Sequence, residues 1–288
     1  MKTTHTLDVP GATLTYDVRG PLPAADGSVP LLLIGQPMDA SGFGTLASYF
    51  PDRTVVTYDP RGLGRSTRND GGQSNSPHQQ AEDLHLLVRE LGGRVDLFGS
   101  SGGAVTGLHL VAAHPADVRT FVAHEPPLLA VLPDADRAFA AERRVQGVYH
   151  QRGWGAGMAA FIAMTSVQGE FPEAFGRELP DPAVFGLPSD DDGSRVDPLL
   201  SGASNAITAY RPDVAALTSA SSDVVVAGGI ESKDTMTWRT SSALADLLGQ
   251  ELTVFPSDHG GFLGDEFGRP GQPEAFAVRL RQVLDGEG

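Results

Sequence analysis

The sequence predicts an α/β fold in which a mostly parallel central sheet is flanked by helices and interrupted by one helical insertion. Three observations support this prediction. Short apolar segments alternate with amphipathic segments up to residue 125, the same alternation returns after residue 222, and residues 126–222 show helical patterns without a clear strand. Strands that alternate with helices at this spacing indicate crossover connections and therefore parallel strands.

The first strands differ in how much of each is expected to be exposed. Residues 13–18 alternate apolar with polar side chains, which is typical of a half-exposed strand. Residues 30–34 and 54–58 are rich in aliphatic and β-branched side chains without that alternation, as expected of strands buried on both faces. A short helix is expected between them at residues 43–50.

The next segment predicts a helix, a strand, a second helix and a second strand. Residues 77–91 place four aliphatic side chains on one helical face, and two glycines follow directly. A short apolar strand is expected at 95–98, a helix at 104–114 and another strand at 119–123. This order predicts neighbouring parallel strands that are joined by helical crossovers.

The pattern changes in residues 126–222, which are expected to form a helical lid. Helical stretches occur near 134–150 and 155–167, and an acidic segment rich in proline and glycine follows at 179–198. The predicted domains are therefore a core of residues 1–125 and 223–288 and a lid of residues 126–222. The remaining core elements are expected at 223–227 (strand), 239–248 (helix), 251–255 (strand) and 273–284 (helix).

Composition excludes several classes of function. The 288 residues include 36 acidic and 21 basic side chains, giving a net charge of −15, which opposes binding to nucleic acids and anionic membranes. Cysteine is absent, which excludes disulfides and thiolate chemistry. The N-terminus lacks the apolar stretch of a signal peptide, and no run of about 18 apolar residues occurs. A cytoplasmic location and a monomer or homodimer are expected.

One motif predicts a nucleophile. Residues 99–103 read Gly-Ser-Ser-Gly-Gly and match Gly-x-Ser-x-Gly between an expected strand and an expected helix, the context of a nucleophile elbow. The sharp turn requires small residues two positions before and after the serine. Ser101 has glycine at both positions, whereas Ser100 has Phe98 behind it. Ser101 is therefore predicted to be the nucleophile.

A serine needs a base to remove its proton and an acid to orient that base. Of the histidines after Ser101, only His259 follows the last predicted strands, in a glycine-rich loop, so it is the predicted base. The acid is expected after strand 223–227, where Glu231 is favoured and Asp234 is the alternative. The other histidines downstream of the nucleophile are His109, His114, His124 and His150.

The negative charge that forms during attack needs backbone donors. One predicted donor is the N–H of Gly102, at a helix N-terminus, and the other is the N–H of Gln36, because Pro37 has none. Neither a metal-binding spacing nor a phosphate-binding glycine loop is evident, so no metal and no cofactor are predicted.

Two further segments carry a family resemblance. Residues 34–37 (Ile-Gly-Gln-Pro) are similar to the His-Gly-x-Pro segment of epoxide-hydrolase-like α/β hydrolases, and residues 59–66 resemble their Asp-x-Arg-Gly-x-Gly-x-Ser turn. The resemblance implies the α/β-hydrolase fold and a catalytic triad. Two departures matter: Ile34 replaces the usual histidine, and Ser101 stands where epoxide hydrolases and haloalkane dehalogenases carry aspartate, which argues against both reactions. The arginines of this turn are interpreted as structural, held by Asp59.

The predicted function is hydrolysis of an ester-like bond in a small, partly apolar substrate through a serine triad. Hydrolysis of lactones, thioesters or carbon–carbon bonds, perhydrolysis, and non-catalytic ligand binding on this fold are the alternatives, because fold does not fix function. The predicted substrate-binding residues are Met38, Ser100, His124, Trp154, Met158 and Phe161. The last three form, with Met164, an apolar face of the lid that is expected to pack against the core and to line part of a pocket.

Overall fold

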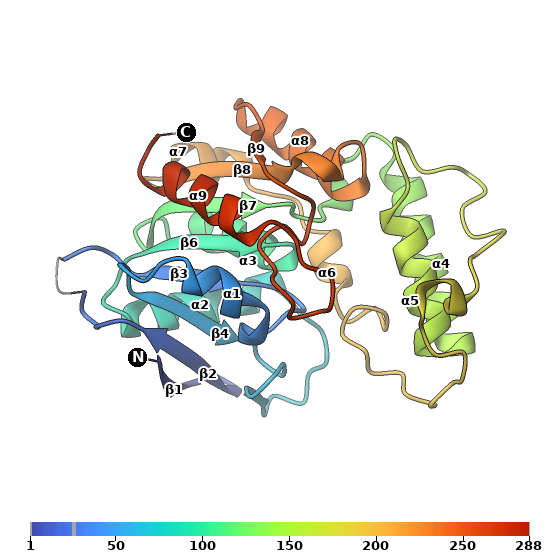
Figure 1. Ribbon diagram of the computed structural model, residues 1–288, viewed down its shortest axis with the longest axis horizontal. Coiled ribbons are helices and arrows are strands. Elements are labelled where there is room, and N and C mark those ends of the chain that lie inside the picture. Colours follow the sequence, from blue (N-terminus) through green and yellow to red (C-terminus); the bar gives the residue numbers. More distant parts are fainter. Residues whose placement is uncertain (1, 25–26, 288) are drawn as a thin grey trace.

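A mostly parallel sheet forms the centre of the protein (Figure 1). The computed structural model describes residues 2–24 and 27–287, and within them nine strands belong to this sheet. β2 pairs antiparallel with β1, β4 and β5, and every other pair is parallel, so the predicted fold class is confirmed. The strands, in spatial order, are β1 (Lys2–Val9), β2 (Ala12–Arg19), β4 (Val55–Asp59), β3 (Leu31–Ile34), β6 (Val95–Ser100), β7 (Val118–His124), β8 (Asp223–Gly229) and β9 (Thr253–Phe255), with β5 (Thr67–Arg68) beside β2.

The central strands are buried on both faces, as their apolar sequences predict. In β3, Leu31 and Leu33 belong to one apolar cluster, whereas Leu32 and Ile34 belong to the cluster on the opposite face. β1 was not expected from the sequence, because nearly all of its side chains are polar and exposed. Backbone hydrogen bonds to β2 hold this edge strand in place, and its sequence lacks the alternation of apolar and polar residues by which strands are predicted.

Helices cover both faces of the sheet. The apolar cluster that contains Leu31 and Leu33 also contains side chains of α1 (Gly44–Ser48) and α9 (Pro273–Leu284). The cluster that contains Leu32 and Ile34, on the other face, also contains side chains of a larger helical layer. That layer consists of α2 (Pro77–Glu90), α3 (Gly102–Ala113), α7 (Val214–Ser219) and α8 (Met236–Leu248).

The insertion between β7 and β8 extends to one side of the sheet (Figure 1). Its two long helices, α4 (Ala135–Arg152) and α5 (Trp154–Thr165), pack together around an apolar cluster that also includes Met236 of α8. Both ends of the insertion pack with the core, since Leu128, Ile207 and Leu217 belong to a core cluster. The division at residues 126 and 222 stays a prediction. The shorter elements here are η2 (Leu129–Val131), η3 (Pro182–Phe185) and α6 (Asn205–Thr208).

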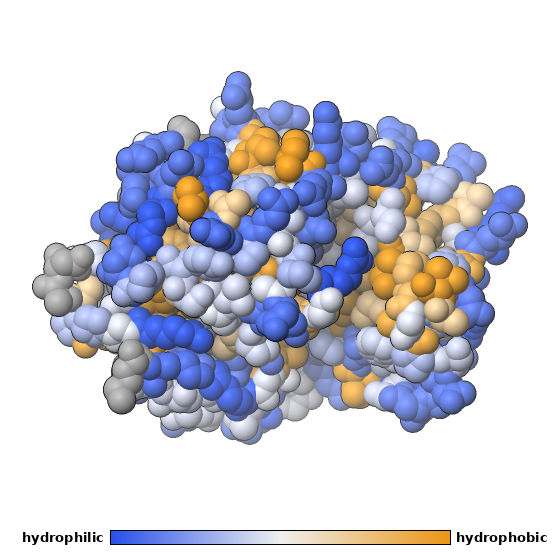
Figure 2. Space-filling model, in the orientation of Figure 1, coloured by the Kyte–Doolittle hydropathy of each residue, from blue (hydrophilic) through white to orange (hydrophobic). Residues whose placement is uncertain are grey.

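The face of the molecule in Figure 2 is mainly hydrophilic, in keeping with the acidic composition. Hydrophobic side chains gather on the insertion, where Val184 of η3 is 73% exposed, and around β9 and α8, where Val254 and Leu247 are also exposed. No helix among residues 2–24 and 27–287 combines the length and apolar character needed to cross a bilayer.

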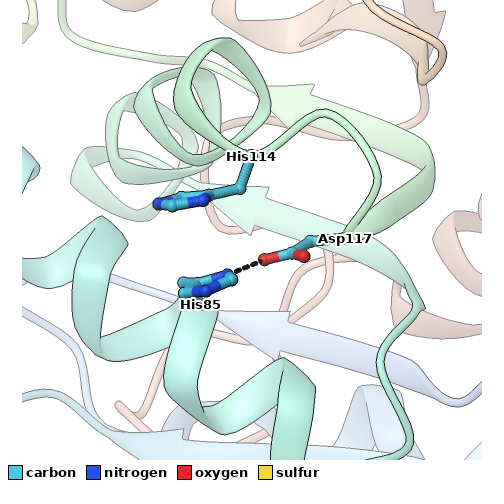
Figure 3. A group of neighbouring side chains, drawn as sticks. All are labelled: His85, His114 and Asp117. Atoms are coloured by element: carbon cyan, nitrogen blue, oxygen red, sulfur yellow. Dashed lines mark hydrogen bonds and ion pairs between the residues drawn. The ribbon is translucent and has the colours of Figure 1, made fainter.

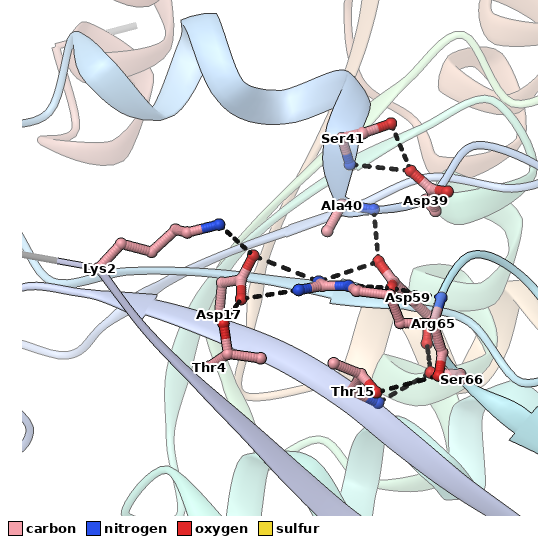
Figure 4. Close-up of polar contacts among 10 residues, drawn as sticks. All are labelled: Lys2, Thr4, Thr15, Asp17, Asp39, Ala40, Ser41, Asp59, Arg65 and Ser66. Atoms are coloured by element: carbon pink, nitrogen blue, oxygen red, sulfur yellow. Dashed lines mark hydrogen bonds and ion pairs between the residues drawn. The ribbon is translucent and has the colours of Figure 1, made fainter.

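The turn that follows β4 is held by ion pairs (Figure 4). Asp59 accepts hydrogen bonds from the backbone N–H of Ala40 (3.0 Å) and from Nε of Arg65 (2.7 Å), and Arg65 also binds Asp17. Asp59 therefore holds Arg65 as expected. The other arginine of the turn, Arg61, departs from the expectation because it pairs with residues on other segments.

Arg61 forms a buried, bidentate ion pair with Asp83 of α2. Its Nε lies 2.7 Å from Oδ2 and its Nη2 lies 2.6 Å from Oδ1, and both side chains are at most 3% exposed. Removing one partner of such a pair leaves an uncompensated charge in the interior. Arg61 also donates to Asp70 (3.0 Å) and to the carbonyl oxygen of Pro10 (3.1 Å), so it ties the turn after β4 to α2 through contacts within the protein.

Asp83→Ala is expected to lower the free energy of unfolding by about 3 kcal/mol, because buried Arg61 would keep only the partly exposed Asp70 as an ion-pair partner. Urea unfolding followed by circular dichroism measures this change. Asp52→Ala is the control, since Asp52 is 61% exposed in its pair with Arg281; a loss of less than about 1 kcal/mol is expected there. Equal losses in both variants would contradict the argument from burial.

Candidate active site

A cavity of about 630 Å³ lies between the carboxyl ends of the central strands and the insertion. Gln36 follows β3, Ser101 follows β6 and His259 follows β9, and all three line this cavity. In open α/β sheets the loops at the carboxyl ends of strands form the usual binding crevice. Helices α4, α5 and α6 supply lining residues from the insertion side.

Ser101 occupies a strained turn between β6 and α3. Its φ and ψ angles are 56° and −127°, a conformation that non-glycine residues rarely adopt. A Cβ atom at Gly99 would lie 2.9 Å from the Cα atom of Ala104, and one at Gly103 would lie 2.5 Å from the carbonyl oxygen of Ile34. The two glycines are therefore required by close backbone contacts, in agreement with the reasoning that selected Ser101 over Ser100.

His259 is bound by a glutamate that the sequence reasoning did not select. Its Nδ1 lies 2.7 Å from Oε2 of Glu125, the residue directly after β7, and the carboxylate is fully buried. Glu125 also accepts hydrogen bonds from the backbone N–H of Gly229 (2.9 Å) and the hydroxyl of Thr237 (2.6 Å). Because Nδ1 is taken by Glu125, Nε2 is the nitrogen available to a partner in the cavity.

The structure does not bring either predicted acid to His259. Glu231 lies in η4 (Ile230–Ser232), is exposed, and accepts a hydrogen bond from Nε2 of Gln272 at 2.9 Å. Asp234 is also exposed, and it adopts a positive φ of 66° in the turn before α8. The expected His259 partners are thus corrected to Glu125: Glu231 lines the cavity but binds Gln272, and Asp234 is exposed in the loop after β8.

The available sequence signal for Glu125 was its place directly after a buried strand. β7 lies next to β8 in parallel register, with His124 opposite Ala227, so the loops after both strands emerge side by side. The loop after β9 brings His259 to the same edge. Glu125 therefore lies one strand closer to the nucleophile than the two acids predicted after β8.

Burial and hydrogen bonding act in opposite directions on this pair. Burial disfavours the charge on Glu125, but the hydrogen bond from His259, the charge of that ring and the Thr237 hydroxyl lower the pKa of Glu125 to about 2. For His259, burial lowers the pKa, and the adjacent Glu125 carboxylate outweighs it and raises the pKa above the ordinary value. The pair therefore consists of an ionised carboxylate and an imidazole whose protonated form is stabilised.

Of the two expected backbone donors, the N–H of Gly102 has a partner within the protein, whereas the role of the Gln36 N–H stays a prediction. The N–H of Gly102 donates to the carbonyl oxygen of Gln36 at 3.2 Å, so in this state that N–H is occupied. The side chain of Gln36 lies against Gly102 and lines the cavity, and the residue is only 2% exposed. Neither its Nε2 nor its Oε1 has a hydrogen-bond partner among the described residues. The side-chain amide of Gln36 is therefore buried beside the cavity without a hydrogen-bond partner among the described residues.

The predicted substrate-binding residues divide into two groups. Met38, Ser100 and Phe161 line the cavity, as does Met164, the fourth apolar residue of the predicted lid face. The structure does not place the other three there. They are His124, Trp154 and Met158.

Each of these three side chains has another position in the fold. Trp154 donates from Nε1 to Asp197 at 3.0 Å, and Met158 packs on the apolar cluster of the insertion. His124 is fully buried beneath the site with its Nδ1 3.3 Å from Oγ of Ser100, and burial lowers its pKa to about 4. Of the apolar residues on this lid face, Phe161 and Met164 thus line the cavity, whereas Trp154 and Met158 pack within the insertion.

One group among the described residues has the spacing that could admit a cation (Figure 3). His85, His114 and Asp117 present ligand atoms within 4.8 Å of one another. Each histidine already has a carboxylate partner: His85 binds Asp117 at 2.6 Å, and His114 binds Glu82 at 2.9 Å. Asp117 precedes β7, so the group lies at the end of that strand opposite the cavity. It takes no part in the candidate active site.

Comparison with known proteins identifies the family of the chain. Residues 31–279 match the family model described as the alpha/beta hydrolase family. The chain therefore belongs to the alpha/beta hydrolase family, which supports a hydrolase.

Individual relatives add detail to the family match. The chain is 28% identical to the uncharacterized hydrolase YraK of Bacillus subtilis (strain 168), with 98% of this chain and 96% of YraK covered. It is similar in fold to a thermophilic esterase from Thermogutta terrifontis (TM-score 0.62, 21% identity, 99% and 98% of the two chains). It is also similar in fold to the enol-lactonase from Burkholderia xenovorans LB400 (TM-score 0.62, 18% identity, 98% and 100%).

Proposed function

We propose that this protein is a serine hydrolase that cleaves an ester-like bond through Ser101, His259 and Glu125. The observation that supports the proposal best is the 2.7 Å contact between His259 and the buried Glu125, at a cavity that Ser101 also lines. A serine in a strained elbow, a histidine and a carboxylate that orients that histidine are the parts that nucleophilic acyl transfer requires. Glu125 takes the place in this triad that the sequence assigned to Glu231.

The reaction follows from the positions of these groups. Nε2 of His259 accepts the proton of Ser101 as the serine oxygen attacks the carbonyl carbon, and Glu125 stabilises the imidazolium that results. His259 returns the proton to the leaving group. Water, activated by the same histidine, then releases the acid from the acyl-enzyme.

The side chain of Gln36 completes the site by stabilising the negative oxygen of the intermediate. Its buried Nε2 has no partner among the described residues and donates to that oxygen once the substrate is bound, and Gly102 contributes its N–H if the bond to the Gln36 carbonyl opens on substrate binding. A buried amide without a partner costs folding free energy, so a role in catalysis explains why it is present.

The substrate is expected to be small to medium in size and partly apolar. A cavity of about 630 Å³ accommodates a molecule of that size, and its apolar lining includes Met38, Phe161, Phe262 and Leu263. The fold neighbours include proteins named as an esterase and as an enol-lactonase, which makes open-chain esters and lactones the first substrates to test.

Hydrolysis of p-nitrophenyl esters from acetate to decanoate tests the proposal, together with labelling by a fluorophosphonate that is located by mass spectrometry. We expect turnover with an optimum chain length that reflects the cavity, and a label on Ser101. A protein that binds ligands without catalysis would neither turn over an ester nor react with the probe. Labelling without turnover of these esters would direct the search to lactones, thioesters and diketones.

Gln36→Leu is expected to lower kcat by about 10²–10³, the usual effect of removing one oxyanion donor. Because the change also removes a buried amide without partners, thermal stability is expected to be unchanged or higher. Steady-state kinetics and a melting curve measure the two effects. Met38→Leu, at a neighbouring lining position without a donor, is the control, and a loss of kcat as large as that of Gln36→Leu would contradict the proposed role.

A further inference from the structure

The insertion places one carboxylate in the cavity that the proposed reaction does not use. Glu142 of α4 lines the cavity, and its Oε1 accepts a hydrogen bond from the hydroxyl of Thr208 of α6 at 2.7 Å. Among the described residues no other hydrogen bond to this carboxylate is found. Burial raises the pKa of Glu142, which reflects the poor solvation of its charge.

The cavity offers this carboxylate no cationic partner. The charged side chains that line the cavity within the described part of the chain are acidic: Glu142, Glu231 and Asp258, besides the titratable His259. Arg143 follows Glu142 in α4 but is exposed and does not line the cavity. A poorly solvated carboxylate with a single hydroxyl partner gains most from a positive charge. The acidic side chains of the cavity do not supply that charge, whereas a cationic ligand does.

The surroundings of Glu142 combine polar and apolar groups. Gln146 and Asn205 also line the cavity and are joined by a hydrogen bond of 2.6 Å, whereas Val145 and Ile207 present apolar surface. These residues belong to the insertion, and Ser101 and His259 belong to the opposite, sheet-side wall. A ligand that reaches both walls therefore needs an apolar span and a polar, positively charged end.

We propose that the insertion side of the cavity is a binding subsite for a substituted ammonium group of the substrate, with Glu142 as its anchor. This inference rests on the proposed function, because it specifies the substrate of the same cavity. The acidic lining also predicts that esters with an anionic tail are poor substrates, since no cationic side chain offsets the repulsion.

Pairs of isosteric substrates test the subsite. The cationic members are p-nitrophenyl esters of ω-trimethylammonio alkanoic acids of increasing length, and the neutral members carry a tert-butyl group in place of trimethylammonio. At the best length, wild-type kcat/KM is expected to be about tenfold higher for the cation. Glu142→Gln keeps an acceptor for Thr208, and it is expected to bring this ratio close to one by lowering kcat/KM for the cationic ester. Glu173→Gln, which removes an exposed carboxylate of the insertion outside the cavity, should leave the ratio unchanged.

A ratio of one or less at every length in the wild type would overturn the subsite, and so would a ratio that survives Glu142→Gln. If the wild type hydrolyses neither member of any pair and does not react with the fluorophosphonate, the proposed function fails instead. Calorimetry then tests the subsite without chemistry: hexyltrimethylammonium is expected to bind the wild type more tightly than hexanesulfonate does, and the reverse order would overturn the inference. This comparison also stands if the Glu142→Gln protein does not fold.

Discussion

Replacing Ser101 by alanine is expected to lower kcat for p-nitrophenyl esters by about 10⁶, the loss found when the nucleophile of a serine triad is removed. Without the hydroxyl no acyl-enzyme can form, although the cavity can still bind the ester. Stopped-time assays at high enzyme concentration measure the residual rate. The fluorophosphonate probe should no longer label the protein.

Ser100→Ala is the matched control, because the two serines are adjacent and both line the cavity. Ser100 ends β6 and lies near His124, so its removal is expected to cost far less activity than removal of Ser101. The opposite order of effects would identify Ser100 as the nucleophile and would contradict the argument from the flanking glycines. Circular dichroism spectra of both variants show whether the fold is retained.

Glu125→Gln is expected to lower kcat by about 10⁴, as in other triads whose acid is replaced by its amide. The amide can offer an N–H to Nδ1 of His259, which favours the wrong tautomer for a base and leaves the imidazolium without its counter-charge. Glu231→Gln and Asp234→Asn are the controls, and both should retain nearly full activity, because neither carboxylate contacts His259 in the structure. Activity that is lost in Glu231→Gln and kept in Glu125→Gln would restore the acid that the sequence predicted.

The pH dependence of the same variant gives a second, independent result. In the wild type, kcat/KM should rise as His259 loses its proton, with a midpoint above the ordinary histidine value of about 6.5, because the carboxylate raises the pKa of His259. In Glu125→Gln the negative charge is gone, burial dominates, and the midpoint should move to lower pH. A midpoint that does not move would show that Glu125 does not act through His259.

The local patterns of the sequence were sufficient for the fold and for the elbow. The apolar strands at β3 and β4 face apolar clusters on both sides of the sheet, so their composition reports their burial directly. The glycines around Ser101 are demanded by contacts within one strand–turn–helix unit and with the strand beside it. Such features depend on neighbours that the sequence places at predictable positions.

The edge strand β1 could not be predicted from the pattern of apolar residues. Its side chains are exposed and polar, so pairing with β2 leaves no pattern in its own residues. The insertion shows the related difficulty that one apolar helical stripe serves two purposes. Phe161 faces the cavity and Trp154 packs toward Asp197, and only the relative placement of α4, α5 and the core separates them.

The sequence alone determined three features: the parallel α/β fold, the place of Ser101 in a strand–turn–helix motif, and the late loop that carries His259. Each depends on residues that are close in the chain or on the general rule that parallel strands end at one edge. The partner of His259 was decided by the tertiary structure, since several carboxylates follow the last parallel strands and composition does not distinguish them. The order of β7, β8 and β9 in the sheet places Glu125, buried and 134 positions from His259 in the chain, within 2.7 Å of its ring, and leaves Glu231 and Asp234 on the surface.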